Sequence, residues 1–218
     1  MKLVVINPNS TVSMTEKAVT AAQNAAPGAM VRGVTCHSSP AAIQGPKDDA
    51  ICRPYVMAEV ALAADNGADA IIIACFDDPA LDEARASVKI PVLGIGEAGF
   101  HAAMMLGGRF SVVTTLPVAI PILEDNLVHY GMANACARVR AAGIAVLELE
   151  DEASGAVAKV SAEIARAKAE DGVGAIVLGC AGMADLAAQM EAAHGLKVID
   201  GVGAAAAFAA ALVNLRRV

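Results

Sequence analysis

Two stretches of the sequence repeat one pattern, in which an apolar run of strand length ends at a cysteine. Residues 70–79 read AIIIACFDDP, and residues 175–183 read AIVLGCAGM. An apolar run that stops abruptly at small, polar or turn-forming residues is typical of a buried parallel strand at its carboxyl end. Cys75 and Cys180, which are 105 positions apart, are therefore both expected to face a crevice.

The repeat extends beyond the two cysteines. Residues 90–98 realign with residues 196–204 at a shift of 106, and short helical segments at 81–85 and 186–190 lie between the aligned parts. The chain therefore reads as two related α/β halves. If they face each other across a pseudo-twofold axis, the two thiols meet in one cleft.

Strand and helix patterns alternate along the chain, which predicts parallel sheets covered by helices on both faces. We expect an N-terminal lobe of residues 1–97 plus about 205–218, which carries Cys75, and a C-terminal lobe of residues 98–204, which carries Cys180. The predicted strands span residues 2–6, 30–35, 70–75, 91–95 and 110–115, a short segment within 139–149, and the run that ends at residue 180. The predicted helices span residues 11–24, 48–66, about 80–87, 117–130 and 154–171, and the segment from 203 onward.

The charge and hydropathy of the sequence argue against several classes of protein. The net charge is −7 and no cluster of Lys and Arg occurs, which argues against a nucleic-acid surface. No run approaches the roughly 18 apolar residues of a membrane span, and the apolar start is too short for a signal peptide. We therefore expect a cytoplasmic protein with a small-molecule substrate, and its uncharged, Ala-rich helix faces favour a homo-oligomer.

Five cysteines, an odd number without C-x-x-C spacing, are expected to be reduced thiols in that compartment. Cys36, Cys52 and Cys136 read as buried apolar residues. Cys75 and Cys180 differ because each lies at the mouth of its strand, beside a predicted helix start that would lower the pKa of a thiol.

Three kinds of chemistry could use two such thiols. A disulfide redox pair would normally show close sequence spacing, which is missing here. A zinc site needs three or four ligands, yet no histidine stands at a strand mouth beside either cysteine; His37, which follows the second predicted strand, is the one candidate. The third is proton transfer, in which one thiolate removes a proton from carbon and the opposing thiol delivers one to the other face. Racemisation suits twofold-related lobes, and backbone amides would have to carry the developing negative charge.

Further motifs could bind a ligand or only shape turns. Residues 7–11 and Thr114–Thr115 follow predicted strands and precede predicted helices, so they are candidate ligand cradles, with turn and cap chemistry as the alternative. Residues 94–99 match G-x-G-x-x-G, but the next strand ends without the acidic residue of a dinucleotide site. Residues 200–203 echo these glycines, which favours a repeated strand-to-helix turn. Residues 148–152 read as a solvated acidic loop.

Five motifs in order resemble the hydantoin and allantoin racemases of the aspartate/glutamate racemase superfamily: residues 7–10, 39–45, 74–79, 110–116 and 177–183. The resemblance covers nearly the whole chain. It implies two Rossmann-like lobes with the active site between them, no cofactor and no metal, and Cys75 and Cys180 as the acid/base catalysts. The substrate-binding residues that it implies are Asn7, Phe76, Asp77, Val113, Thr114, Ala181, Gly182 and Gly201.

The sequence departs from that family at two positions. Asp77 stands where glycine or another small residue is common, and Gln44 where glutamate is frequent. Allantoin and amino-acid hydantoins therefore both remain candidate substrates. An aspartate or glutamate racemase, or a related isomerase or decarboxylase, is the alternative enzyme, although Phe76-Asp77 and Ala181-Gly182 lack the polar pairs that grip a free carboxylate in such racemases. A bilobal binding protein with inert thiols is the non-enzymatic alternative.

Overall fold

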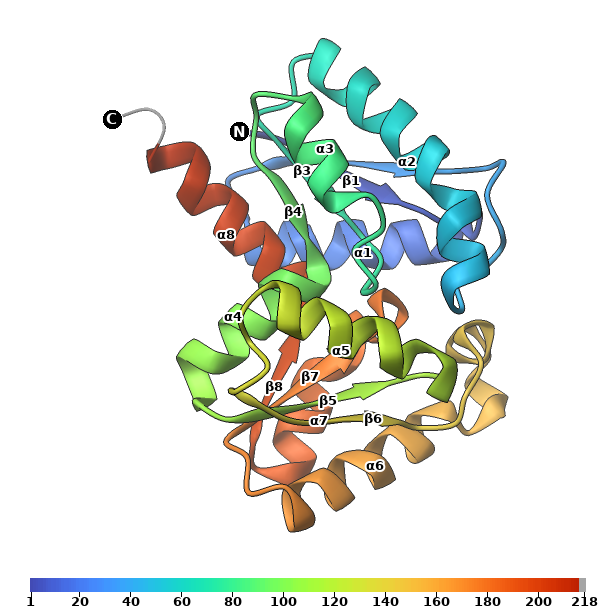
Figure 1. Ribbon diagram of the computed structural model, residues 1–218, viewed down its shortest axis with the longest axis vertical. Helices are drawn as coiled ribbons and strands as arrows, with labels where there is room; N and C mark the ends of the chain where they lie inside the picture. The colour runs from blue at the N-terminus through green and yellow to red at the C-terminus, as the bar shows by residue number, and fades with distance from the viewer. Residues whose placement is uncertain (216–218) are drawn as a thin grey trace.

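The computed structural model describes residues 1–215 and contains two four-stranded parallel sheets, one in each half of the chain (Figure 1). In the first sheet the strand order is β2-β1-β3-β4, and in the second it is β6-β5-β7-β8. Because β1 to β4 correspond in order to β5 to β8, the predicted pair of α/β lobes is confirmed. The strands are β1 (Lys2–Asn7), β2 (Met30–Thr35), β3 (Ala70–Ile73), β4 (Val92–Gly94), β5 (Phe110–Thr114), β6 (Cys136–Ala141), β7 (Ala175–Gly179) and β8 (Lys197–Asp200).

Helices cover both faces of each sheet, as expected for parallel strands joined by crossovers. The α-helices are α1 (Val12–Ala25), α2 (Pro46–Asp65), α3 (Leu81–Ser87), α4 (Ile95–Gly107), α5 (Ile120–His129), α6 (Ala156–Glu170), α7 (Ala187–His194) and α8 (Gly201–Leu215). Residues 1–215 also contain four short 3₁₀ helices: η1 (Pro117–Ala119), η2 (Val146–Glu150), η3 (Glu152–Ser154) and η4 (Ala181–Leu186).

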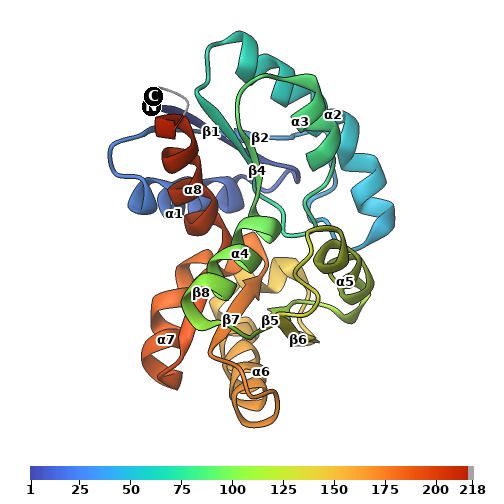
Figure 2. The same ribbon diagram turned by 60° about the vertical axis from the view of Figure 1, so that its left-hand side comes forward.

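One continuous core joins the two lobes. It contains Leu3 and Ile72 of the first sheet, Phe100 of α4, Phe110 of the second sheet and Val202 of α8, all fully buried. Helix α8 packs against α1 and α4 (Figure 2). The predicted lobe boundaries at residues 97 and about 205 fall inside α4 and α8, the helices that pack together where the lobes join. Residues 216–218 of the predicted N-terminal lobe lie outside the described residues.

The glycines of the G-x-G-x-x-G motif make room for a buried carboxylate. Asp78 accepts hydrogen bonds from the backbone amides of Gly96 (2.9 Å) and Glu97 (2.8 Å), at the start of α4. A Cβ at Gly94 would lie 2.3 Å from the Asp78 side chain, and a Cβ at Gly96 would lie 2.4 Å from the Phe76 carbonyl oxygen. These contacts bind the loop that carries Cys75 to the first turn of α4.

We predict that Gly96→Ala lowers the free energy of unfolding by about 1–3 kcal/mol, because the added methyl group cannot fit without moving backbone or the Asp78 carboxylate. Urea denaturation followed by circular dichroism measures the effect. Gly28→Ala is the control, since nothing lies within 4 Å of a Cβ there. Equal denaturation midpoints for the two variants would show that the Cys75 loop is not held by this close packing.

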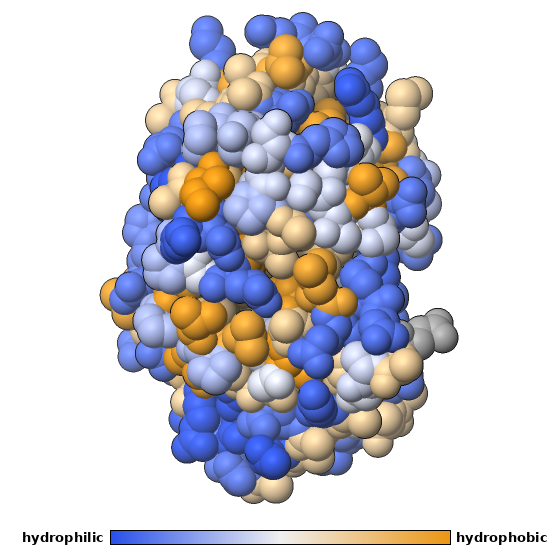
Figure 3. All heavy atoms as spheres, turned by 90° about the vertical axis from the view of Figure 1, so that its right-hand side faces the viewer, coloured by the Kyte–Doolittle hydropathy of each residue, from blue (hydrophilic) through white to orange (hydrophobic). Residues whose placement is uncertain are grey.

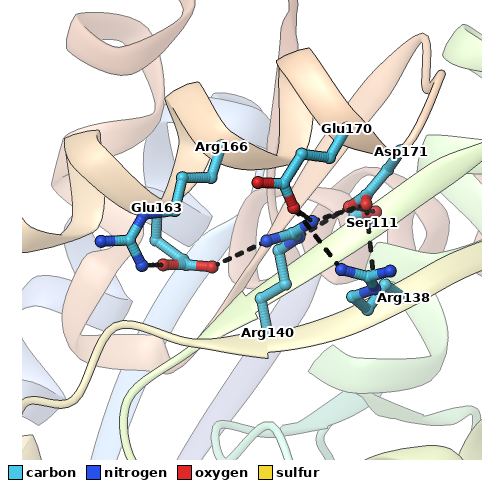
Figure 4. A network of polar contacts seen from close by, with 7 residues as sticks. All are labelled: Ser111, Arg138, Arg140, Glu163, Arg166, Glu170 and Asp171. Carbon is cyan, nitrogen blue, oxygen red and sulfur yellow. Dashed lines mark hydrogen bonds and ion pairs between the residues drawn. The ribbon is translucent and has the colours of Figure 1, made fainter.

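A buried ion-pair network fixes α6 on the second sheet (Figure 4). Arg140 of β6 contacts Asp171 at 2.6 Å and Glu163 at 3.1 Å, and these side chains are only 6%, 2% and 9% exposed. Ser111 of β5 donates a further hydrogen bond to Asp171 at 2.7 Å. The Arg140 guanidinium lowers the pKa of Asp171, so the carboxylate is charged where it is buried.

Candidate active site

A cavity of about 30 Å³ lies between the two lobes, beyond the carboxyl ends of the strands. Strands β1 and β5 both run toward the right-hand side of Figure 1. Seen from that side, apolar side chains gather across the middle of the molecule (Figure 3). The cavity is lined by Asn9, Met14, Ile43, Gln44, Ala74, Cys75, Phe76, Asp77, Thr114, Thr115, Leu116, Val118, Ala119, Val146, Gly179, Cys180, Ala181 and Gly182.

The two predicted cysteines occupy equivalent places in the two lobes. Cys75 lies two residues beyond β3 and Cys180 directly follows β7, and both half-buried side chains line the cavity. The Cys75 sulfur accepts a hydrogen bond from the backbone amide of Asp77, and the Cys180 sulfur accepts one from Gly182. Each thiol therefore has the amide two residues further along as its partner, as the repeat in the sequence suggests.

Burial determines the acidity of both thiols. It raises the pKa of Cys75 well above its usual value and that of Cys180 to about 11, and the nearby Asp77 carboxylate raises both further. The expectation of lowered pKa values is wrong, because burial outweighs the amide hydrogen bonds. Only the short 3₁₀ helix η4 begins directly after Cys180, and α3 begins six residues after Cys75. The two thiols also couple electrostatically, so a charge on Cys180 disfavours a second charge on Cys75.

A third ionisable group lies beside the thiols. Asp77 is 8% exposed, and burial, together with the Asp49 charge, raises the pKa of its carboxyl to about 7. Its Oδ2 atom is buried and has no hydrogen-bond partner among the described residues. Its backbone is fixed, since the Asn126 side chain donates a hydrogen bond to the Asp77 carbonyl oxygen at 2.9 Å.

Polar contacts join the two lobes, one of them at the cavity. The Gln44 side chain accepts a hydrogen bond from the backbone amide of Val146 at 3.0 Å, and Lys17 forms an ion pair with Glu150 at 2.8 Å. The prediction of a solvated acidic loop at residues 148–152 is wrong in this respect: Glu150 is one of the 3₁₀ residues of η2, and its side chain is 19% exposed. Glu150 attaches this segment to the opposite lobe.

Five of the predicted substrate-binding residues line the cavity, namely Phe76, Asp77, Thr114, Ala181 and Gly182. The Thr114 hydroxyl donates to the Gly179 carbonyl oxygen at 2.9 Å and so joins β5 to β7. The other three stand elsewhere. Val113 is fully buried in the core of the second lobe, and Gly201 packs against the Ile95 carbonyl oxygen at the contact of α4 with α8.

Asn7 is likewise absent from the cavity lining as the described residues form it, and it shapes the first turn instead. Its side-chain amide donates to Asn9 (2.9 Å) and to the Thr15 hydroxyl (3.0 Å). Asn9, and not Asn7, is the residue of this turn that lines the cavity. Of the lining residues that were not predicted, Asn9, Gln44 and Thr115 belong to motifs noted in the sequence. Met14, Val118 and Val146 carry no sequence signal, because they reach the cavity only through tertiary packing.

The described residues contain no cluster of three or more His, Cys, Asp or Glu side chains placed to hold a metal ion. Within the same part of the chain, no helix is both long enough and apolar enough to cross a membrane.

Comparisons with known proteins place the chain in a family of racemases. The family described as Asp/Glu/Hydantoin racemase matches residues 3–209. A curated hydantoin racemase of Rhizobium meliloti is 44% identical over 221 residues, which cover 98% of this chain and 89% of the relative. The structure of an allantoin racemase from Klebsiella pneumoniae is 42% identical and superposes with a TM-score of 0.96, covering 99% of this chain and 89% of that one. A glutamate racemase from Francisella tularensis, 19% identical with a TM-score of 0.72 over 99% of this chain and 81% of its own, shares the fold.

Proposed function

Since the chain belongs to the Asp/Glu/hydantoin racemase family and is an isomerase, we propose that it interconverts the enantiomers of a 5-substituted hydantoin or of allantoin by proton transfer between Cys75 and Cys180, without a cofactor. The observation that carries the proposal is that one cavity has two thiols at equivalent positions of two facing lobes. Groups placed in this way can approach one substrate carbon from opposite sides.

In one direction, the Cys75 thiolate removes the proton from the ring carbon C5. The electron pair of the C–H bond passes into the neighbouring carbonyl group as an enolate, and the Cys180 thiol then delivers its proton to the opposite face of C5. Cys75 ends as a thiol and Cys180 as a thiolate, so the reaction of the other enantiomer runs in reverse. A charge on Cys180 disfavours a second charge on Cys75, which supports a site that holds at most one thiolate at a time, as this scheme requires.

The cavity lining supports a neutral ring as substrate. None of the described residues that line it is a lysine or arginine, so no cation there would hold the free carboxylate of aspartate or glutamate. Asp77 would repel such a group. Apolar side chains, among them Met14 and Val118, instead suit an uncharged ring.

Polarimetry tests the proposal. One enantiomer each of allantoin, a 5-substituted hydantoin, aspartate and glutamate is incubated with the protein, and optical rotation is followed with time. We expect rotation to decay to zero with at least one of the two ring substrates. Decay with the amino acids alone would support an amino-acid racemase, and unchanged rotation with all four compounds would support a binding protein with inert thiols.

The predicted assembly and location remain part of this proposal: a cytoplasmic homo-oligomer. An apolar groove runs between α4 and α8, where Met105 and Leu106 are 64% and 63% exposed. Such exposed apolar residues suit contact with another protein surface. Light scattering on the purified protein would give its mass in solution.

A further inference from the structure

Among the described residues that line the cavity, Asp77 is the one ionisable residue that proton transfer between the cysteines does not use. It stands beside both thiols, where its charge raises their pKa values and so opposes formation of the thiolate. A buried acceptor without a donor also costs free energy. Asp77 therefore costs stability and lowers the fraction of each cysteine that is present as thiolate, so its presence calls for another role, such as substrate binding.

The surroundings of Asp77 supply no partner. Its Oδ2 atom is buried and unpaired among the described residues, and the carboxylate that acts on it most strongly, Asp49, is of like charge. Asp49 is itself engaged, because Arg53 contacts its Oδ2 at 2.7 Å. Asp77 is one of the residues that line the cavity, so a molecule bound there is the candidate source of the missing donor.

We infer that Asp77 selects the substrate: its side-chain oxygen accepts a hydrogen bond from an N–H group on the C5 substituent, and thereby favours ureido or carboxamide substituents over hydrocarbon ones. This inference rests on the proposed function. Because burial raises the pKa of the carboxyl to about 7, both its charged and its neutral form exist near neutral pH, and a neutral N–H donor pairs with the free oxygen lone pairs of either. A site with a buried acceptor rejects a substituent that cannot satisfy it, because the acceptor is then desolvated without a partner.

Two substrates of matched shape test the inference. Allantoin carries a ureido group on C5, and 5-isobutylhydantoin carries a hydrocarbon group of similar size and branching without an N–H. The ratio of kcat/KM for allantoin to kcat/KM for 5-isobutylhydantoin is measured for the wild-type protein, Asp77→Ala and Asp77→Asn. Asp125→Ala, an exposed carboxylate on α5, is the matched control.

We expect the ratio to favour allantoin in the wild type and to fall by about 10- to 100-fold in Asp77→Ala. Asp77→Asn should retain part of the preference, since its amide oxygen still accepts a hydrogen bond, and Asp125→Ala should keep the wild-type ratio. An unchanged ratio in Asp77→Ala, or an equal loss of kcat/KM for both substrates, would overturn the inference and leave the proposed racemase function intact. If the wild type racemises neither compound, the proposed function is refuted, and this inference with it.

Discussion

Replacement of either Cys75 or Cys180 by serine is expected to lower the rate of racemisation by about 10²- to 10⁴-fold in both directions, the range typical of a lost general acid or base. Serine is nearly the size of cysteine, but its hydroxyl is far less acidic, so it can neither form the base nor release a proton readily. Because each thiol serves as the base for one enantiomer and as the acid for the other, both directions require both sulfurs.

Cys136→Ser is the control for this experiment. Its thiol is half-buried at the start of β6 and does not belong to the cavity lining, and we expect that variant to keep the wild-type rate. Circular dichroism spectra and denaturation midpoints of all three variants separate a chemical effect from loss of the fold. Either Cys75→Ser or Cys180→Ser retaining a substantial rate in both directions would contradict a two-thiol mechanism.

The largest expected effect on stability comes from Arg140→Met, which should lower the free energy of unfolding by about 3–5 kcal/mol at pH 7. The substitution removes the closest guanidinium of the buried Asp171 carboxylate and one of the two guanidinium groups that contact Glu163, although methionine fills much of the space. Urea denaturation measures the loss. Arg166→Met is the matched control: its side chain is 65% exposed and pairs with Glu163 at 2.9 Å, so a change below about 1 kcal/mol is expected.

The effect of Arg140→Met should also depend on pH. Arg140 lowers the pKa of Asp171 in the folded protein. The stability that this pairing contributes is therefore present above the unfolded-state pKa of aspartate, about 3.9, and disappears as the pH falls through the lowered folded value. The gap in stability between wild type and variant should narrow below about pH 4. Equal stability of the two proteins at pH 7 would show that the network does not hold α6 on the second sheet.

The fold could be predicted because the same strand pattern occurs in both halves of the sequence. The run before Cys75 and its echo before Cys180 required buried parallel strands at equivalent positions, and the two sheets with matching strand order confirm that prediction. The glycines at 94 and 96 showed a tight strand-to-helix turn. That they accommodate the Asp78 carboxylate could not be known, because Asp78 reaches them only when the two loops pack together.

The candidate site could be predicted where its residues lie at strand ends, because parallel strands bring their carboxyl ends to one edge. Phe76, Thr114 and Ala181 are of this kind. Two features of the site could not be predicted, because they depend on burial and on packing between the lobes. The thiol pKa values are raised, since the loss of water outweighs the amide hydrogen bonds. Val146 meets Gln44 from the other lobe, a contact that sequence spacing could not indicate.

Isotope incorporation tests the two-thiol account most directly. A single enantiomer of a substrate that the protein racemises is incubated with it in deuterated water, and at low conversion the two enantiomers are separated and analysed by mass spectrometry. We predict deuterium at C5 of the product enantiomer and protium at C5 of the remaining substrate, because the sulfur that removes the proton is not the sulfur that delivers the new one. Deuterium appearing equally fast in both enantiomers would mean that one group serves both faces, and would contradict the account.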